Sequence, residues 1–232
     1  MIENSLTVAR RSFLSRLGVG ATVLGAGTAG LLPAQADAAA MGFQPARHAI
    51  DDWLDAPKGA HRMVIDSSTA EGGGSAMLYA TNFFTANKAG YNLDTPAIAV
   101  VVVLRHFATV FAYTDAMWAK YGAAFSEIAN FKDPKTNTVP TTNLYNAQGY
   151  GVMLTNFGNT ISSLVEKKVQ FAVCNVATRF FAGAIADKMK GNADMIYQEL
   201  ASNLIPNAHL VAAGVLGASR AQERGYTFLF AG

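Results

Sequence analysis

The segment Pro96-Ala-Ile-Ala-Val-Val-Val-Val-Leu104 is the most hydrophobic part of the chain beyond residue 40. Its apolar residues run continuously and do not alternate with polar ones, which is typical of a strand that is buried on both faces. The segment is too short to span a membrane as a helix, which takes about 20 residues. The pattern therefore predicts a central strand of a parallel sheet that lies between helices.

Segments with strand-like and helix-like patterns alternate around this stretch. Four further strands are expected at 61–68, 169–174, 209–213 and 226–230. Helices are expected at 42–58, 75–89, 115–121, 124–131, 157–165, 174–190, 192–206 and 216–224. The alternation predicts an α/β fold, namely a three-layer α/β/α arrangement with a mostly parallel sheet of about five strands.

Three consecutive glycines, Gly72, Gly73 and Gly74, follow the first expected strand. A glycine-rich turn before a helix can hold a phosphate group on its backbone N–H groups. The residues here match neither the P-loop pattern nor the dinucleotide-binding spacing. We therefore interpret the run as a flexible turn, with the next helix starting at Ser75 and stopping at Gly90.

The N-terminal residues resemble a bacterial export signal. Arg10-Arg11-Ser12-Phe13-Leu14 precedes a weakly hydrophobic run, 17–32, in which five of sixteen residues are glycine. This is the pattern of a twin-arginine signal peptide, and small-residue cleavage sites follow at 34–36 and 38–40. We expect a cleaved signal at 1–40 and a single domain at 41–232, with an uncleaved anchor as the alternative. The predicted location is the periplasm, and the membrane is needed only for export.

The composition excludes several classes of function. The chain has 51% hydrophobic and 15% charged residues and a net charge of +2, so it can bury a full core and shows no excess of basic residues for nucleic acid. It contains no haem, flavin or iron–sulfur motif, and we expect no cofactor. A metal site built from histidines and the cysteine is conceivable, but no two of these residues have close ligand spacing, so we expect none.

The most distinctive chemical group is Cys174, the only cysteine, in Val169-Gln-Phe-Ala-Val-Cys174-Asn175. It lies where a strand passes into a helix, and a helix start stabilises a thiolate. In the oxidising periplasm it has no internal disulfide partner, which leaves a free thiol, a modified sulfur or a bond to another chain. The alternative is that Cys174 is a small buried apolar residue.

Arg105 and His106 directly follow the strand that ends at Leu104. Ligands of open parallel sheets bind beyond the carboxyl ends of the strands, so we expect both residues at the same edge as Cys174. There they would lower the pKa of the thiol or bind an anionic sulfur substrate. A Cys–His pair with His106 as the catalytic base is less favoured, because no third residue at a recognisable spacing would orient the histidine.

Five short segments occur together in this order: Arg105-His106 after the valine-rich strand, Asp115-Ala-Met-Trp118-Ala-Lys-Tyr121, Phe171-Ala-Val-Cys174-Asn175, Asn203-Leu-Ile-Pro206 and Gln222-Glu-Arg-Gly225-Tyr226. Together they resemble exported members of the DsrE/DsrF-like family over roughly 61–230.

The resemblance implies a small α/β domain that forms a homo-oligomer. In some family members a cysteine at the strand-to-helix turn accepts sulfur as a persulfide, and Cys174 matches that position. The chain departs from the small cytoplasmic sulfur carriers in its size, its export signal and an extra polar loop at 132–148.

Two functions are therefore expected from the sequence. The first is a periplasmic sulfur-binding or sulfur-relay protein, in effect a sulfurtransferase-like carrier, that receives sulfur from a small sulfur compound or a protein donor. The second is a non-catalytic oligomeric binding or assembly module, in which Cys174 is structural and the loop at 132–148 contacts a partner. A loop of this length is commonly a lid, a binding loop or an oligomer contact.

Overall fold

The computed structural model describes residues 44–232, and Pro45–Gly232 form one compact unit. The predicted signal peptide at 1–40 lies outside the described residues. Within 44–232, no helix combines the length and the apolarity needed to cross a membrane.

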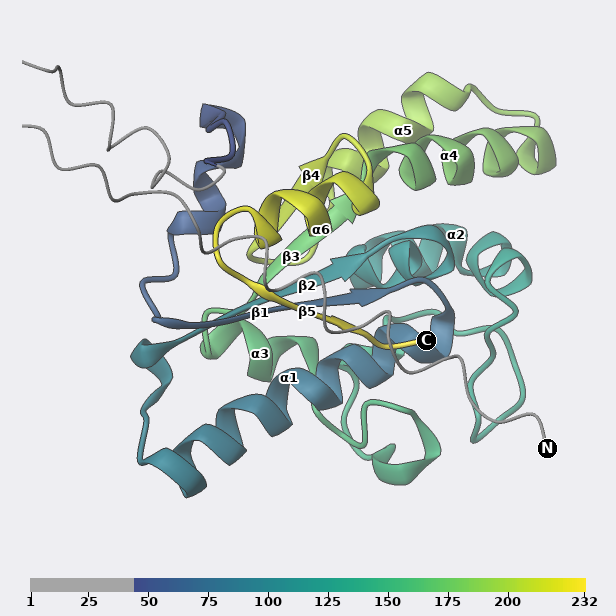
Figure 1. Cartoon of the computed structure of the whole chain (residues 1–232). Coiled ribbons are helices and arrows are strands. Elements are labelled where there is room, and N and C mark those ends of the chain that lie inside the picture. Colours follow the sequence, from purple (N-terminus) through teal and green to yellow (C-terminus); the bar gives the residue numbers. More distant parts are fainter. Residues whose placement is uncertain (1–43) are drawn as a thin grey trace, which may run out of the picture. The chain divides into compact units, whose positions relative to one another are not determined.

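Five parallel strands form a single sheet in the order β4-β3-β2-β1-β5 (Figure 1). The strands are β1 (His61–Ser67), β2 (Ile98–Leu104), β3 (Gln170–Cys174), β4 (Ala208–Val211) and β5 (Thr227–Phe230). This confirms the predicted α/β class and the number of strands, and every strand pair is parallel. All seven residues of β2 are buried, as expected of the central strand.

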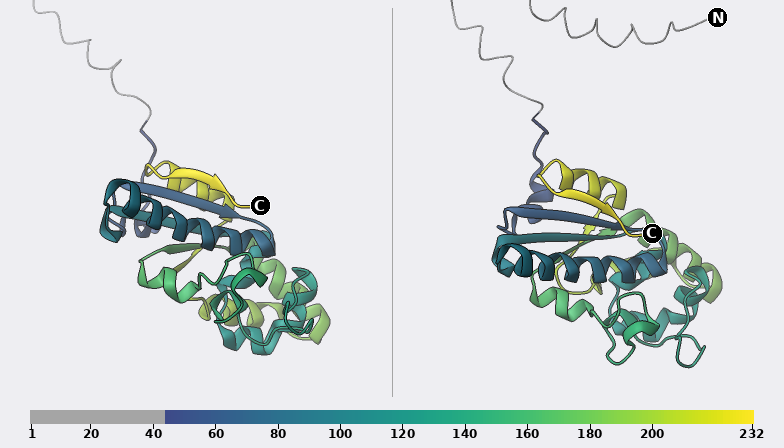
Figure 2. Two further views of the ribbon diagram at one scale, coloured as in Figure 1. Left: turned by 90° about the horizontal axis from the view of Figure 1, so that it is seen from below. Right: turned by 60° about the horizontal axis from the view of Figure 1, so that its bottom comes forward.

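Helices cover both faces of the sheet. They are α1 (Ala70–Tyr91), α2 (Asp115–Ile128), α3 (Ile161–Glu166), α4 (Asn175–Met189), α5 (Ala193–Ser202) and α6 (Gly214–Gln222). Figures 1 and 2 show α1 and α6 on opposite sides of the sheet. A 3₁₀ helix at Ala49–Asp55 packs on the α6 side through the fully buried Leu54.

The direction in which the chain crosses the sheet explains this division. From β1 to β4 each new strand is added on the same side of the previous one, whereas the last crossover returns to place β5 beside β1. Parallel crossovers are almost always right-handed, so reversing the direction moves the connecting helix to the other face. The large core accordingly contains residues of α1 to α5, and the smaller core contains those of α6.

The expected glycine turn is wrong, because the glycines lie inside the first helix. Helix α1 starts at Ala70, and the Thr69 hydroxyl caps it by accepting a hydrogen bond from the N–H of Gly72 at 2.9 Å. A side chain at position 72 would overlap the backbone carbonyl of Gly232. The glycine is therefore needed for close packing. The helix also continues past Gly90 to Tyr91, and its C-cap, Asn92, has a left-handed conformation.

Other expected boundaries also change. The two short helices predicted at 115–121 and 124–131 are the single helix α2, because Gly122 and Ala123 continue the helical backbone. Helix α3 is shorter than expected, since Phe157 lies outside it with a positive φ of 50°. Helix α6 starts two residues earlier, at Gly214. The helix expected at 42–58 is reduced to the 3₁₀ helix at 49–55.

We predict that Gly72→Ala lowers the free energy of unfolding by about 1–3 kcal/mol, because the added methyl group would overlap the backbone of the C-terminal residues. Chemical denaturation of the purified protein measures this change.

Gly183→Ala is the matched control, because Gly183 lies inside α4 and nothing lies within 4 Å of the position that its Cβ would take. This variant should gain about 0.5–1 kcal/mol from the better helix propensity of alanine. If both variants change the free energy of unfolding equally, packing does not require glycine at position 72.

Candidate functional site

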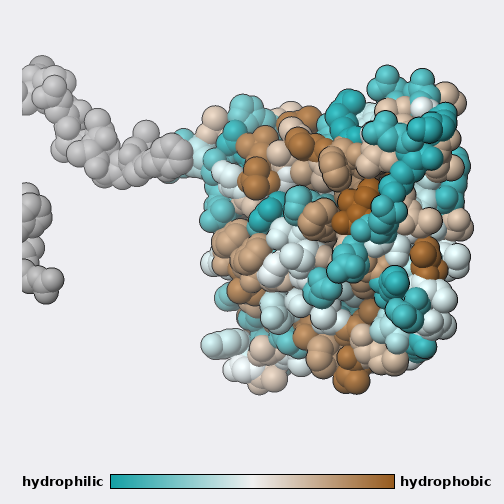
Figure 3. All heavy atoms as spheres, turned by 90° about the vertical axis from the view of Figure 1, so that its right-hand side faces the viewer, coloured by the Kyte–Doolittle hydropathy of each residue, from teal (hydrophilic) through white to brown (hydrophobic). Residues whose placement is uncertain are grey.

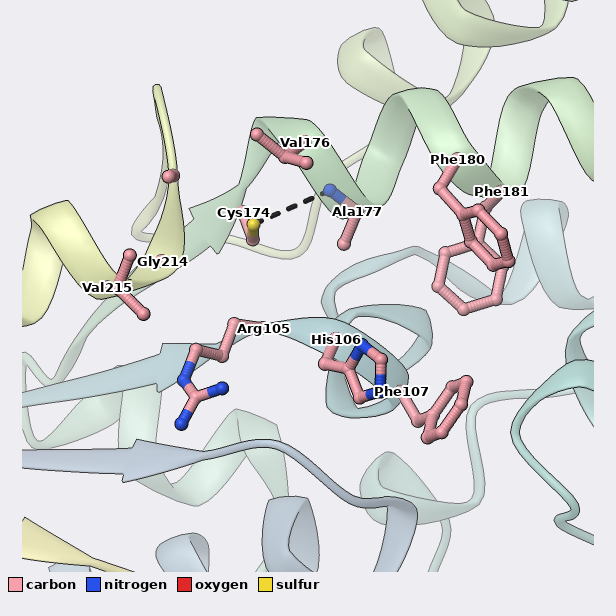
Figure 4. A pocket seen from close by; sticks show the side chains of 11 residues that line it. Arg105, His106, Phe107, Cys174, Val176, Ala177, Phe180, Phe181, Gly214 and Val215 are labelled. Carbon is pink, nitrogen blue, oxygen red and sulfur yellow. Dashed lines mark hydrogen bonds between the residues drawn. The ribbon is translucent and has the colours of Figure 1, made fainter.

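A cavity of about 380 Å³ lies at the carboxyl ends of β2, β3 and β4 (Figure 4). The segments that follow these three strands form it. Its lining residues are Arg105, His106, Phe107, Cys174, Val176, Ala177, Phe180, Phe181, Ala213, Gly214 and Val215. The structure thus brings together the three residues that the sequence placed at one edge, namely Cys174, Arg105 and His106.

Cys174 is both the last residue of β3 and the N-cap of α4. Its Sγ accepts a hydrogen bond from the backbone N–H of Ala177 at 3.4 Å, which Figure 4 marks as a dashed line. A hydrogen bond from a helix N–H group stabilises a thiolate more than a neutral thiol. The residue is only 7% exposed, so its sulfur is reached through the cavity and is not on the open surface.

A buried hydrogen-bond chain holds the turn at Cys174 from behind. The Tyr113 hydroxyl donates to Oγ1 of Thr178 at 3.0 Å, and the Thr178 hydroxyl donates to the carbonyl of Cys174 at 3.0 Å. Burial raises the pKa of Tyr113, the bond with Thr178 opposes this shift, and a negative charge on Cys174 adds to it. Tyr113 therefore remains a neutral donor, and the position of the cysteine backbone is fixed.

Arg105 forms a close ion pair with Asp66, the second-last residue of β1. Nε of Arg105 lies 2.8 Å from Oδ1 of Asp66, and Nη2 lies 2.9 Å from Oδ2, so the two groups meet side by side. The Asp66 side chain is 6% exposed and that of Arg105 is 26% exposed. The hydrogen bonds to Asp66 raise the pKa of Arg105 above its usual value despite its burial, and a negative charge on Cys174 raises it further.

His106 takes a left-handed backbone conformation with φ of 52°, directly after the extended Arg105. Its ring lies against that of Phe107, with 4.0 Å between the centroids. Within residues 44–232 its ring nitrogens make no hydrogen bond, and the residue is exposed. Among the described residues, no side chain is hydrogen-bonded to His106 in a way that would orient it as a base.

Most of the cavity wall is apolar. Phe107 and Phe181 lie at one end with Phe180, which packs edge-on to Phe181 at 5.7 Å (Figure 4). At the mouth, Val176 and Val215 are each 62% exposed, and Phe180 is 58% exposed. Figure 3 views the molecule from this side and shows apolar side chains in brown patches among polar ones.

Gly214 closes the other end of the cavity by lying against Arg105. A Cβ at position 214 would overlap Cβ of Arg105 and lie 3.1 Å from its Cδ. The glycine therefore lets the start of α6 approach the arginine stem, and it also lets the guanidinium lie beside Asp66.

Asp66 and Gly214 were missed as site residues at the sequence level. Asp66 pairs in register with Val103 of β2, two residues before Arg105. Its position at the carboxyl end of β1 could therefore have indicated an ion pair with Arg105. The contact of Gly214 depends on side-chain packing between distant segments and left no signal.

The remaining predicted groups lie elsewhere. In the loop at 132–148, Asn143 and Tyr145 are buried, and the Asn143 side chain donates to the carbonyls of Phe111 and Tyr113. No residue of this loop lines the cavity.

The histidines expected as possible metal ligands are not grouped with Cys174 into a metal site among the described residues. His209 stacks on Trp53. Across the described part of the chain, no three or more His, Cys, Asp or Glu side chains are grouped as metal ligands.

Comparison with models of known protein families finds no match, and comparison with curated protein sequences finds none either.

Asp66→Asn keeps the size of the side chain and removes its charge, leaving the partly buried Arg105 cation without a counter-charge. We predict a loss of about 1–3 kcal/mol in the free energy of unfolding, less than for a fully buried pair because Arg105 retains contact with water. Urea denaturation measures it.

Asp94→Asn is the control, because the Asp94 side chain is 75% exposed in its pair with Lys88. It should cost less than about 1 kcal/mol. A loss at Asp66 no larger than at Asp94 would contradict the view that the Asp66–Arg105 pair supports the site.

Proposed function

We propose that this chain is a periplasmic sulfur-relay protein of the DsrE/DsrF-like kind, in which Cys174 holds sulfur as a persulfide. The observation that carries the proposal is the position of Cys174: the sulfur lines a cavity at the carboxyl edge of the sheet and accepts a helix N–H group. This is the edge at which α/β folds bind ligands. The resemblance quoted above supplies the type of chemistry.

The relay consists of two exchange steps. The Cys174 thiolate attacks a sulfur of the donor, a sulfur–sulfur bond of the donor breaks, and a new one forms on the cysteine. An acceptor thiolate then attacks the outer sulfur and releases the Cys174 thiolate. Both steps favour a stabilised thiolate as the attacking or leaving group, which the N–H of Ala177 provides.

Export belongs to the same proposal. The Arg10-Arg11 motif and the apolar run after it support secretion through the twin-arginine pathway, which carries folded proteins. The protein would then work in the periplasm, where its single thiol has no internal disulfide partner.

One observation favours the second candidate, a binding or assembly module with a structural cysteine. Cys174 is only 7% exposed, and small buried cysteines are common in cores. The two candidates differ in whether the thiol reacts in the folded protein.

Incubation of the purified protein with benzyl hydrodisulfide, a sulfur donor that carries no fixed charge, tests this difference. We predict that the folded protein gains the mass of sulfur atoms on Cys174, that the gain proceeds faster than in the urea-unfolded chain, and that dithiothreitol removes it. Intact-protein mass spectrometry follows each step.

Cys174→Ser controls for sulfur that is held non-covalently. Uptake by this variant, or a folded protein whose thiol reacts only after unfolding, would support the assembly module instead.

A homo-oligomer is the third part of the proposal, and the edge strand β5 supports it. This strand pairs only with β1 among the described residues, and Phe228 and Phe230 on it are 48% and 49% exposed. An exposed apolar edge strand is suited to pairing with another chain.

We predict that Phe228→Lys shifts the protein toward the monomer in sedimentation velocity. Val152→Lys, at a residue that is 79% exposed away from β5, should leave the assembly unchanged. A wild-type protein that sediments as a monomer would contradict this part of the proposal.

A further inference from the structure

The charges around the cavity indicate which sulfur donors it admits. Among its lining residues, Arg105 is the only lysine, arginine, aspartate or glutamate. Its guanidinium is already paired side by side with the carboxylate of Asp66. The pair as a whole is neutral, so the cavity offers no uncompensated charge from these residues.

The wall opposite this ion pair is suited to an apolar group. Phe107, Phe180 and Phe181 lie together at one end, and Val176 and Val215 frame the mouth. A volume of about 380 Å³ is enough for a small ring or a short branched chain, near the lower end of ligand pockets.

We propose that the cavity selects the protonated, neutral form of an organic hydrodisulfide, R–S–SH with an aromatic or branched alkyl R, as the sulfur donor of Cys174. This inference rests on the proposed sulfur relay and names its substrate class. The R group would lie against the phenylalanines, and the terminal sulfur would face Sγ of Cys174.

The transfer balances without any other reactant. The Cys174 thiolate attacks the terminal sulfur of R–S–SH, the donor sulfur–sulfur bond breaks, and a sulfur–sulfur bond forms on the cysteine. The leaving R–S⁻ takes up the proton that Cys174 gave up on ionisation. The products are the Cys174 persulfide and the thiol R–SH, and no electrons are gained or lost overall.

Small anionic donors are disfavoured by the same geometry. An anion that enters the cavity loses water, and burying a charge is costly unless a free counter-charge meets it. Asp66 already uses the charge of Arg105. The expectation from the sequence that Arg105 and His106 bind an anionic sulfur substrate stays a prediction, and the charged reagent described next tests it.

Three methanethiosulfonate reagents test the selection without any sulfur relay. They carry benzyl, sulfonatoethyl or trimethylammonioethyl groups, and each transfers its group to a thiolate with release of methanesulfinate. The rate on the folded protein is divided by the rate on the urea-unfolded chain, which removes the intrinsic reactivity of each reagent.

We expect this ratio to be about tenfold or more higher for the benzyl reagent than for either charged reagent. Phe180→Ser should reduce the advantage. Met195→Ser should not, because Met195 is 72% exposed on α5 and does not line the cavity. Asp66→Asn should raise the ratio for the sulfonate reagent several-fold, since it frees the charge of Arg105.

A sulfonatoethyl ratio equal to or above the benzyl ratio would overturn the proposal, and so would a thiol that is inert to all three reagents. If Asp66→Asn does not fold, the comparison of Phe180→Ser with Met195→Ser still tests whether the apolar wall causes the preference for the benzyl reagent. A benzyl preference among the methanethiosulfonate reagents, without sulfur uptake from benzyl hydrodisulfide, would leave the selectivity standing and refute the relay. Sulfur uptake without a benzyl preference would support the relay and refute the selectivity.

Discussion

The burial of β2 on both faces is the constraint on which the rest of the structure depends. Its backbone pairs with β1 on one side and with β3 on the other, and its valine side chains need an apolar layer above and below. Helices must therefore cover both faces, and parallel strands place all of their carboxyl ends at one edge. The segments that follow β2, β3 and β4 meet at this edge, and the cavity lies between them.

The reversal of chain direction before β5 adds a second constraint. Helix α6 covers the sheet face opposite to the one that α1 covers, and its first residues lie beside the end of β3. Cys174 is in register with Val211, whose side chain packs in the core beneath α6. Gly214 and Val215 at the start of α6 therefore line the same cavity as Cys174, whose Sγ accepts a hydrogen bond from the Ala177 N–H at the start of α4.

Much of this arrangement could be predicted from the sequence. The unbroken apolar run before Leu104 predicted the central strand, and the residues directly after the strands, Arg105, His106 and Cys174, were placed at one edge by the geometry of parallel sheets alone. What local patterns did not contain were contacts between distant segments. Gly72 belongs to a glycine run that is typical of a turn, yet it lies inside a helix. Glycine is needed there because a Cβ would overlap the carbonyl oxygen of Gly232. The neutralisation of Arg105 likewise depends on a strand that is distant in sequence.

The contact between Gly214 and Arg105 has a consequence for the variation of this fold. The start of α6 lies where a single added carbon would overlap the arginine stem, so the two positions share one volume. Because the overlap is with Cβ itself, a larger residue at 214 requires glycine at 105 or a shift of the start of α6, and losing the arginine would in turn leave Asp66 without its ion-pair partner. Substitution at these three positions should therefore be correlated in evolution, and a chain that changes one of them would carry a cavity of different charge.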